Sequence, residues 1–185
     1  TRAWRRARER KALPSSKRLV WLRTRSGGER VQLDDQNRLT FDVPGIILDF
    51  GGIAKGWCAQ RMSDRLDALG FPAHLSDAGG DLVIGAAPPG EEGWTVFTND
   101  SLKRGPQVDC AIAASGDRYR YLAFEGKRYS HILDPHTGLG IIDSAEVTVI
   151  AADGARADAM ASAITVSEAR DGFAPREHMD RYRDS

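Results

Sequence analysis

The first part of the chain alternates short apolar runs with turns rich in glycine, aspartate and asparagine. The runs are RLVWLR (18–23), ERVQL (29–33), RLTFDV (38–43) and GIILDF (45–50), and SGG and DDQN separate the first three. Short β-branched and aromatic runs bounded by such residues are typical of strands. We therefore expect a strand in each run, the last of them leading into a glycine turn.

A helical spacing of apolar residues begins directly after that turn. The residues that recur at helical intervals are Ile53, Trp57, Met62, Leu66 and Leu69. Gly70 then provides a stop signal, because glycine is the usual residue just past the end of a helix. This stretch therefore predicts a strand, a glycine turn and a helix in succession.

The remainder of the chain predicts mostly strands and one further helix. A short strand is expected to break at DAGGD (77–81), and further strands are expected within 82–86, 93–99, 108–115, 118–133 and 145–152. EGK (125–127) reads as a hairpin turn. GARADAMASAITVS (154–167) reads as a helix because alanine has the highest helix propensity.

These patterns predict one α+β domain with mostly antiparallel strands. A length of 185 residues suits a single domain that buries a core without disulfides or structural metal. We expect a basic helical segment over 1–17, the main domain over 18–167 and a polar, frayed tail over 168–185.

The charge balance disfavours nucleic acid or an anionic membrane as a partner. Lysine and arginine together number 26, as do aspartate and glutamate, so no overall field attracts polyanions. The basic N-terminal stretch reads as an exposed helix with Trp4 and Ala7 packed inward, and we favour that over a nucleic-acid arm. No apolar stretch of about 18 residues is present, so no transmembrane segment is expected.

The glycine turn LDFGGIAKG (48–56) is the first candidate for chemistry. Adjacent glycines allow close approach of the backbone to a ligand, and the following helix start presents unpaired N–H groups. Lys55 would lie in the first turn of that helix. The spacing matches neither the P-loop nor the dinucleotide fingerprint. A phosphate site and a purely structural corner are therefore equally open.

The segment RYSHILDPHTG (128–138) is the second candidate. His131 is able to accept a proton near neutral pH, although a structural role is the commoner one for a single histidine. Ser130, His131 and Asp134 do not make a hydrolase triad, because adjacent strand residues point to opposite faces. No GxSxG elbow is present either.

Two further segments carry carboxylates. Asp158 and Ser162 lie four residues apart, on one face of the predicted helix. Such oxygens suit a hard cation such as Mg²⁺, but a simple hydrogen bond on the helix surface is the more frequent arrangement. In SDAGGD (76–81), we expect Asp77 and Asp81 to bond backbone N–H groups of the turn between them.

Taken in order, these segments resemble a family pattern. LDFGGIAKGW, SDAGGDLVIG, IAASGDRYRY, SHILDPHTG and ADAMAS follow one another as D-L-G-(G/A)-I-A-K-G-Y, N-x-G-G-(D/E), T-S-G-x-x-x-(R/N)-Y, S-H-(I/V)-(I/L/V)-D-P-x-T-G and A-D-A-x-x-(T/S) do in ApbE-type FAD:protein FMN transferases. The resemblance runs from about Leu13 and Pro14 to Ile164 and departs from the pattern at Trp57, Ser76 and Ala114. It implies an ApbE-like, T-fold-related α+β fold.

The resemblance also implies an activity and a site. Members of this family split FAD, attach FMN through a phosphoester to a threonine or serine of an acceptor flavoprotein, and release AMP with the help of Mg²⁺. By resemblance, Asp49, Lys55, His131 and Ile132 contact FAD, and His131 is the base. The implied metal ligands are the Gly52 carbonyl, the Asp158 and Ser162 side chains and, close by, the Ala161 carbonyl.

Three alternatives to transfer stay open at this level. The site could hydrolyse FAD to FMN and AMP, the chain could bind flavin or a partner without turnover, or it could be a fragment. The last two arise because nothing before Leu13 resembles the family segment that covers FAD in relatives. The compartment also stays open, since many relatives are exported lipoproteins and others are cytosolic.

Overall fold

The computed structural model describes residues 2–97, 103–117, 120–142 and 146–171. The chain forms two compact units, each built from two separate segments of the sequence. The first unit comprises Thr1–Asp49 and Asp117–Ser144, and the second comprises Phe50–Gly116 and Ala145–Ser185.

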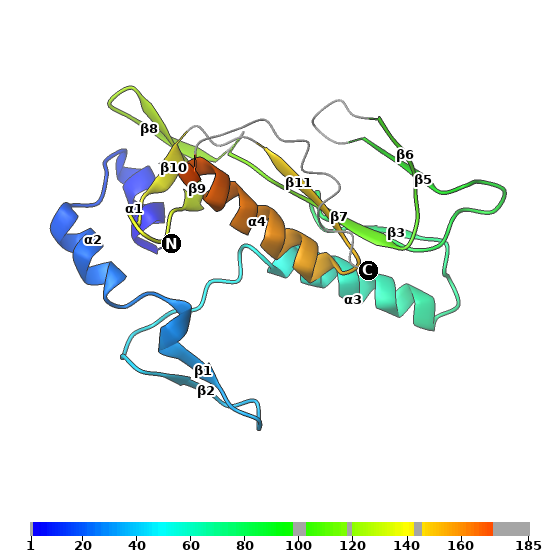
Figure 1. The fold of residues 1–185 in the computed structure, drawn as a ribbon, viewed down its shortest axis with the longest axis horizontal. Helices are drawn as coiled ribbons and strands as arrows, with labels where there is room; N and C mark the ends of the chain where they lie inside the picture. The colour runs from blue at the N-terminus through cyan, green and yellow to red at the C-terminus, as the bar shows by residue number, and fades with distance from the viewer. Residues whose placement is uncertain (1, 98–102, 118–119, 143–145, 172–185) are drawn as a thin grey trace. The chain divides into compact units, whose positions relative to one another are not determined.

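The first unit contains two helices, a hairpin and a small sheet (Figure 1). Its helical elements are α1 (Arg2–Arg10), α2 (Ser16–Arg23) and the 3₁₀ turn η1 (Gly28–Arg30). Strands β1 (Val31–Leu33) and β2 (Leu39–Phe41) form the hairpin. Strands β8 (Tyr121–Phe124), β9 (Lys127–Leu133) and β10 (Gly140–Ile142) form an antiparallel sheet with β9 in the centre.

The core of the first unit lies where α1 packs on this sheet. Trp4, Ala7, Leu122 and Tyr129 form one buried cluster. The Trp4 indole N–H donates to the Ser130 carbonyl at 3.0 Å, and the Trp4 and Tyr129 rings meet edge to face with centroids 6.0 Å apart. The expected basic helix with Trp4 and Ala7 buried is thereby confirmed.

Two expected strands of the first unit are wrong. Residues 18–23 belong to helix α2, whose N-terminus is capped by the Ser15 hydroxyl accepting from the Arg18 N–H. A serine cap and good helix formers outweigh the apolar run, because no neighbouring strand pairs with it. Residues 45–50 form no strand either, and Ile47 is 62% exposed.

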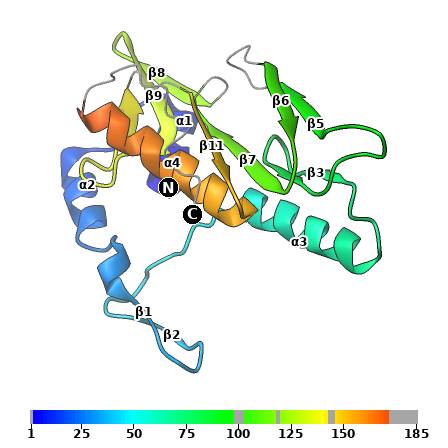
Figure 2. The ribbon, with the colours of Figure 1, turned by 45° about the vertical axis from the view of Figure 1, so that its right-hand side comes forward.

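The second unit is a sheet covered by two helices. The sheet has the antiparallel order β11 (Val147–Ala151), β7 (Cys110–Ser115), β4 (Leu82–Ile84) and β3 (Leu75–Asp77). Helix α3 (Ala54–Ala68) contacts β3 and β4, while α4 (Gly154–Asp171) contacts β7 and β11. Strands β5 (Trp94–Phe97) and β6 (Lys103–Gln107) form a separate hairpin. Figures 1 and 2 show α3 and α4 side by side.

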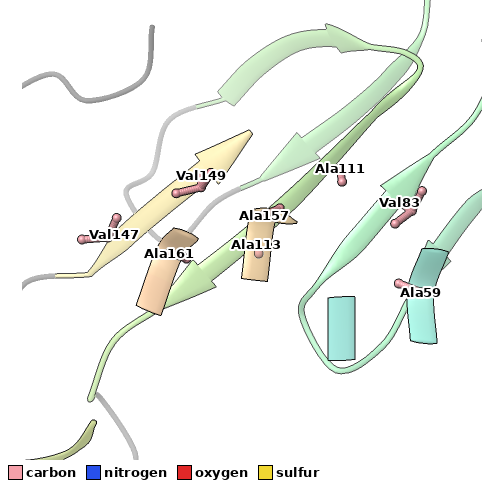
Figure 3. Packing of buried hydrophobic residues seen from close by; sticks show 8 residues of the cluster. All are labelled: Ala59, Val83, Ala111, Ala113, Val147, Val149, Ala157 and Ala161. Atoms are coloured by element: carbon pink, nitrogen blue, oxygen red, sulfur yellow. The ribbon is translucent and has the colours of Figure 1, made fainter. Parts of the chain in front are cut away.

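Small residues allow the helices to pack closely on the sheet and on each other. The central cluster, drawn in Figure 3, consists of Ala59, Val83, Ala111, Ala113, Val147, Val149, Ala157 and Ala161. A Cβ placed at Gly56 of α3 would collide with the Gly154 carbonyl at the start of α4. This close approach between Gly56 and Gly154 brings the first turns of both helices together.

The mixed α+β class with antiparallel sheets is confirmed. The helices expected after the glycine turn and over 154–167 are confirmed as α3 and α4. Positions 98–99, 118–119 and 145 of the expected strands, and the tail from 172 onward, lie outside the described residues. Among the helices that are described, none combines the length and hydropathy needed to cross a membrane. The domain boundaries after 17 and 167 stay predictions.

Candidate active site

The glycine turn of the second unit directly precedes α3. The N–H groups of Ile53 and Ala54 both donate to the Phe50 carbonyl, at 3.1 and 2.9 Å, and the helix begins at Ala54. Lys55 therefore lies in the first turn of α3. A Cβ added at Gly52 would lie 3.3 Å from the Ser162 hydroxyl oxygen of α4. The turn thus brings Gly52 next to one of the residues implied as metal ligands.

Asp158 lies on the side of α4 that faces the same turn. Its carboxylate oxygen Oδ2 accepts a hydrogen bond from the Gly56 N–H at 3.2 Å, and the residue is only 6% exposed. Because Ser162 follows one helical turn later, Asp158 and Ser162 present two oxygens beside the glycine turn. The structure therefore brings together the Gly52, Lys55, Asp158 and Ser162 positions.

Ala161 is also beside this cluster, but its carbonyl is already engaged. The Thr165 hydroxyl donates to it at 2.7 Å, and its place within α4 gives it a backbone hydrogen bond as well. A carbonyl oxygen has two lone pairs, so a metal at Ala161 would have to displace one of these donors.

The loop between β3 and β4 carries two aspartates, and only one of them has the role that the sequence predicted. Asp77 behaves as expected, because its carboxylate accepts from the Gly80 N–H at 2.7 Å. Asp81 does not cap the turn. Its Oδ2 lies 2.7 Å from the Lys55 ammonium, and its side chain is 2% exposed. Its other oxygen, Oδ1, has no hydrogen-bond partner among the described residues.

The electrostatics of this cluster are set by burial. Burial raises the pKa of Asp81, the Lys55 ammonium lowers it, and the nearby Asp158 carboxylate raises it further. Asp81 and Asp158 are thus two buried acidic side chains, and the Lys55 ammonium, whose side chain is 46% exposed, pairs with Asp81. Within the described ranges, no group of three or more histidine, cysteine or acidic residues has the geometry of a metal site.

The oxygen donors nevertheless fit Mg²⁺. This cation typically takes one or two protein carboxylates and completes its coordination with water and substrate phosphates. Asp158 and Ser162 supply side-chain oxygens, the Gly52 backbone lies beside Ser162, and Asp81 brings a buried oxygen without a hydrogen-bond partner among the described residues. The donor set thus suits a hard divalent cation.

The first unit contains the other residues implied by the resemblance. Asp49 accepts a hydrogen bond from the Arg5 guanidinium at 3.2 Å. His131 and Ile132 lie on β9, where the Ile132 N–H donates to the buried Ser130 hydroxyl at 3.1 Å. Asp49, His131 and Ile132 therefore belong to one unit, and the lysine and carboxylate cluster belongs to the other.

The surroundings of His131 lower its pKa, which favours the neutral imidazole. Burial is the main cause that lowers its pKa, and the charges of Arg120 and Arg8 lower it further. The Arg120 backbone and the Asp117 carboxylate act in the opposite direction. The ring atom Nδ1 is buried without a hydrogen-bond partner among the described residues. A neutral ring is the form that can take a proton from a hydroxyl group.

The structure also excludes a triad at this place. The Asp134 carboxylate accepts from the His136 N–H at 2.8 Å, and the Gly138 N–H donates to the Asp134 carbonyl. Asp134 therefore shapes the turn after β9. The Ser130 side chain is fully buried and bonded to the Ile132 N–H, so it is unsuited to act as a nucleophile.

Asp81 is the site residue that sequence reasoning assigned to another role. The sequence did contain features that could have identified it. Asp81 closes a double-glycine turn directly before an apolar strand, and it falls on the acidic end of N-x-G-G-(D/E). Arg5 pairs with Asp49, and Arg8 lowers the pKa of His131. The sequence did not distinguish them, because they lie in a helix with five arginines.

Solved structures define the class of this fold. The flavinyl transferase ApbE of Pseudomonas stutzeri superposes with a TM-score of 0.75 at 32% identity, covering 83% of this chain and 49% of that one. The ApbE protein of Thermotoga maritima gives a TM-score of 0.71 at 35% identity, covering 86% and 53%. The fold is that of ApbE flavinyl transferases.

The family follows from the sequence comparisons. The ApbE family model matches residues 1–182, which extends beyond both ends of the resemblance noted at 13–164. An FAD:protein FMN transferase of Vibrio cholerae is 30% identical over 173 residues, which are 89% of this chain and 52% of that protein. The chain belongs to the ApbE family. It spans about half the length of the curated relatives it matches.

Proposed function

We propose that this chain is a Mg²⁺-dependent FAD:protein FMN transferase. The observation that carries the proposal is the convergence of Gly52, Lys55, Asp158 and Ser162 at one helix crossing of the second unit. Curated relatives that match most of this chain bear the name FAD:protein FMN transferase, which supports the same activity. The acceptor would be a flavoprotein with a threonine or serine hydroxyl.

The proposed site divides its tasks among these residues. Asp158, Ser162 and the Gly52 carbonyl would hold Mg²⁺, with the Ala161 carbonyl beside them. When bound, the cation would neutralise phosphate charge and polarise the phosphorus–oxygen bonds. Asp49, Lys55 and Ile132 would contact FAD, and the Lys55 ammonium would add positive charge near its pyrophosphate.

The proposed reaction transfers FMN from one oxygen to another. His131 takes the proton of the acceptor hydroxyl, whose oxygen attacks the phosphorus on the FMN side of the pyrophosphate. The bond from that phosphorus to the bridging oxygen breaks, and AMP leaves with the bridging oxygen. The products are an FMN phosphoester on the acceptor, AMP and a proton on His131.

Incubation of the chain with FAD, Mg²⁺ and a threonine-containing acceptor peptide tests this function. The proposal expects AMP together with a covalently fluorescent peptide. AMP without a labelled peptide, when the peptide is labelled by a relative of this family, would indicate an FAD pyrophosphatase instead. Binding of FAD with no AMP would indicate a flavin-binding module and contradict the proposal.

A further inference from the structure

Asp81 is among the most deeply buried side chains of the second unit, although its carboxyl group is ionisable. The residue is 1% exposed, and the Lys55 ammonium is the partner of Oδ2, at 2.7 Å. Oδ1 is buried and has no hydrogen-bond partner among the described residues. A buried carboxylate with an unsatisfied oxygen destabilises a fold, because the lost hydration is not replaced.

A purely structural role does not account for this arrangement. Asp77, four residues earlier, stabilises the turn with its carboxylate while remaining exposed. The turn is further closed by the Ala78 N–H donating to the Asp81 carbonyl at 2.9 Å, which any residue at 81 would supply. The Asp81 side chain is therefore not required by the turn that contains it.

The groups around Asp81 indicate the role of its side chain. Asp81 and Asp158 are both buried and are linked through the first turn of α3, where the Lys55 ammonium pairs with Asp81 and the Gly56 N–H donates to Asp158. The Lys55 ammonium pairs with the Asp81 carboxyl group. Asp158 lies one helical turn before Ser162, which is next to Gly52, and a divalent cation bound there would favour a pyrophosphate.

We propose that Asp81 is a positioning residue of the metal and pyrophosphate site, which adds its charge to that of Asp158 and holds the Lys55 ammonium beside the cation. The inference rests on the proposed function for the identity of the phosphate ligand. It does not rest on turnover, because binding of the cation is measured without FAD.

Titration of the purified chain with Mn²⁺ in the absence of FAD, followed by electron paramagnetic resonance, tests this role. Asp81→Asn keeps the shape and removes the charge, and it should weaken Mn²⁺ binding about 10- to 100-fold, as loss of a residue supporting metal ligands does. Asp81→Glu should restore part of the affinity. Asp77→Asn, in the same loop, should bind Mn²⁺ like the wild type.

A double variant provides a second test of this role if Asp81→Asn alone is poorly folded. Replacing Lys55 by Met together with Asp81→Asn removes both partners of this ion pair, so neither charge is left without its partner. Because the loss of the Lys55 charge by itself favours a cation, the matched reference is Lys55→Met alone, and the double variant should bind Mn²⁺ about 10-fold or more weakly than Lys55→Met. Wild-type affinity in a folded Asp81→Asn variant, or equal affinity in Lys55→Met and the double variant, would overturn the proposal.

These measurements distinguish a failure of the proposed role of Asp81 from a failure of the proposed transferase function. Weakened Mn²⁺ binding in Asp81→Asn, combined with a wild type that forms no AMP from FAD, would support the role of Asp81 and contradict the proposed function. Normal Mn²⁺ binding in folded Asp81→Asn, combined with FMN transfer by the wild type, would contradict the role of Asp81 alone.

Discussion

The Gly56 N–H donates to the Asp158 carboxylate at 3.2 Å, so the first turn of α3 fixes the orientation of an acidic side chain on α4. The contact requires a glycine at position 56. A Cβ there would collide with the Gly154 carbonyl and lie 2.8 Å from the Asp158 Cβ. The fold and the candidate metal site therefore depend on the same close approach.

Gly56→Ala should consequently destabilise the chain and disturb the site. Overpacking of this kind typically costs about 1–3 kcal/mol. Urea unfolding measures the loss, and Mn²⁺ titration should show weaker binding in the same variant. Gly105→Ala is the matched control, since a Cβ at Gly105 has no atom within 4 Å. Equal stability of the two variants would contradict the helix crossing described above.

The hydrogen bond from Trp4 to the Ser130 carbonyl gives a second prediction, for the first unit. Trp4→Phe keeps most of the apolar volume but leaves a buried carbonyl without its donor. The expected loss is about 1–3 kcal/mol in the free energy of unfolding. Trp21→Phe should cost less, because Trp21 is 45% exposed and lies between the Arg18 and Arg25 guanidinium groups.

The sequence predicted the elements that carry their own local signals. The apolar spacing from Ile53 located α3, and the alanine-rich segment located α4. EGK formed the expected tight hairpin, in which Glu125 and Gly126 both have positive φ. Each of these signals acts within a few residues, so no knowledge of distant neighbours is needed.

Strands without a strong local signal were harder to predict. The apolar run 45–50 has no pairing strand, while β10 pairs with β9 although only three residues long. Strand formation depends on partners that are distant in sequence. The same reason hid the role of Asp81, whose partner Lys55 lies 26 positions earlier.

The lowered pKa of His131 gives a pH prediction. A histidine whose pKa is depressed stays neutral to lower pH. In a plot of the peptide-labelling rate against pH, the fall on the acidic side should therefore lie below the ordinary histidine pKa of about 6.5. Arg8→Ala removes one positive charge that lowers this pKa and should move this fall to higher pH. NMR titration of the His131 ring measures the same shift without turnover, and Arg6→Ala should leave it unchanged.

Folding stability should follow the same histidine. Because the folded-state pKa is below the unfolded one, His131 contributes stability above about pH 6.5 that is lost as the pH falls through the folded-state pKa. His131→Gln should flatten this part of the stability profile. An unchanged acid dependence in the variant would show that His131 is not the group responsible.

Asp158 supplies the prediction for the metal itself. Asp158→Asn should raise the Mg²⁺ concentration needed for half-maximal FAD cleavage about 10-fold or more, because a charged ligand is replaced by a neutral one. Asp35→Asn, on the exposed β1–β2 turn, is the control. Identical Mg²⁺ dependence in wild type and Asp158→Asn would remove Asp158 from the ligand set.

The most direct test of the central claim is mass spectrometry of an acceptor peptide after incubation with the chain, FAD and Mg²⁺. The account predicts FMN attached through phosphate to the acceptor threonine, with AMP formed in equal amount. His131→Ala should abolish the attachment while still binding Mn²⁺. Attachment at the wild-type rate by His131→Ala would contradict the assignment of His131 as the base. If the wild-type chain leaves a proven acceptor peptide unmodified, FMN transfer itself is contradicted.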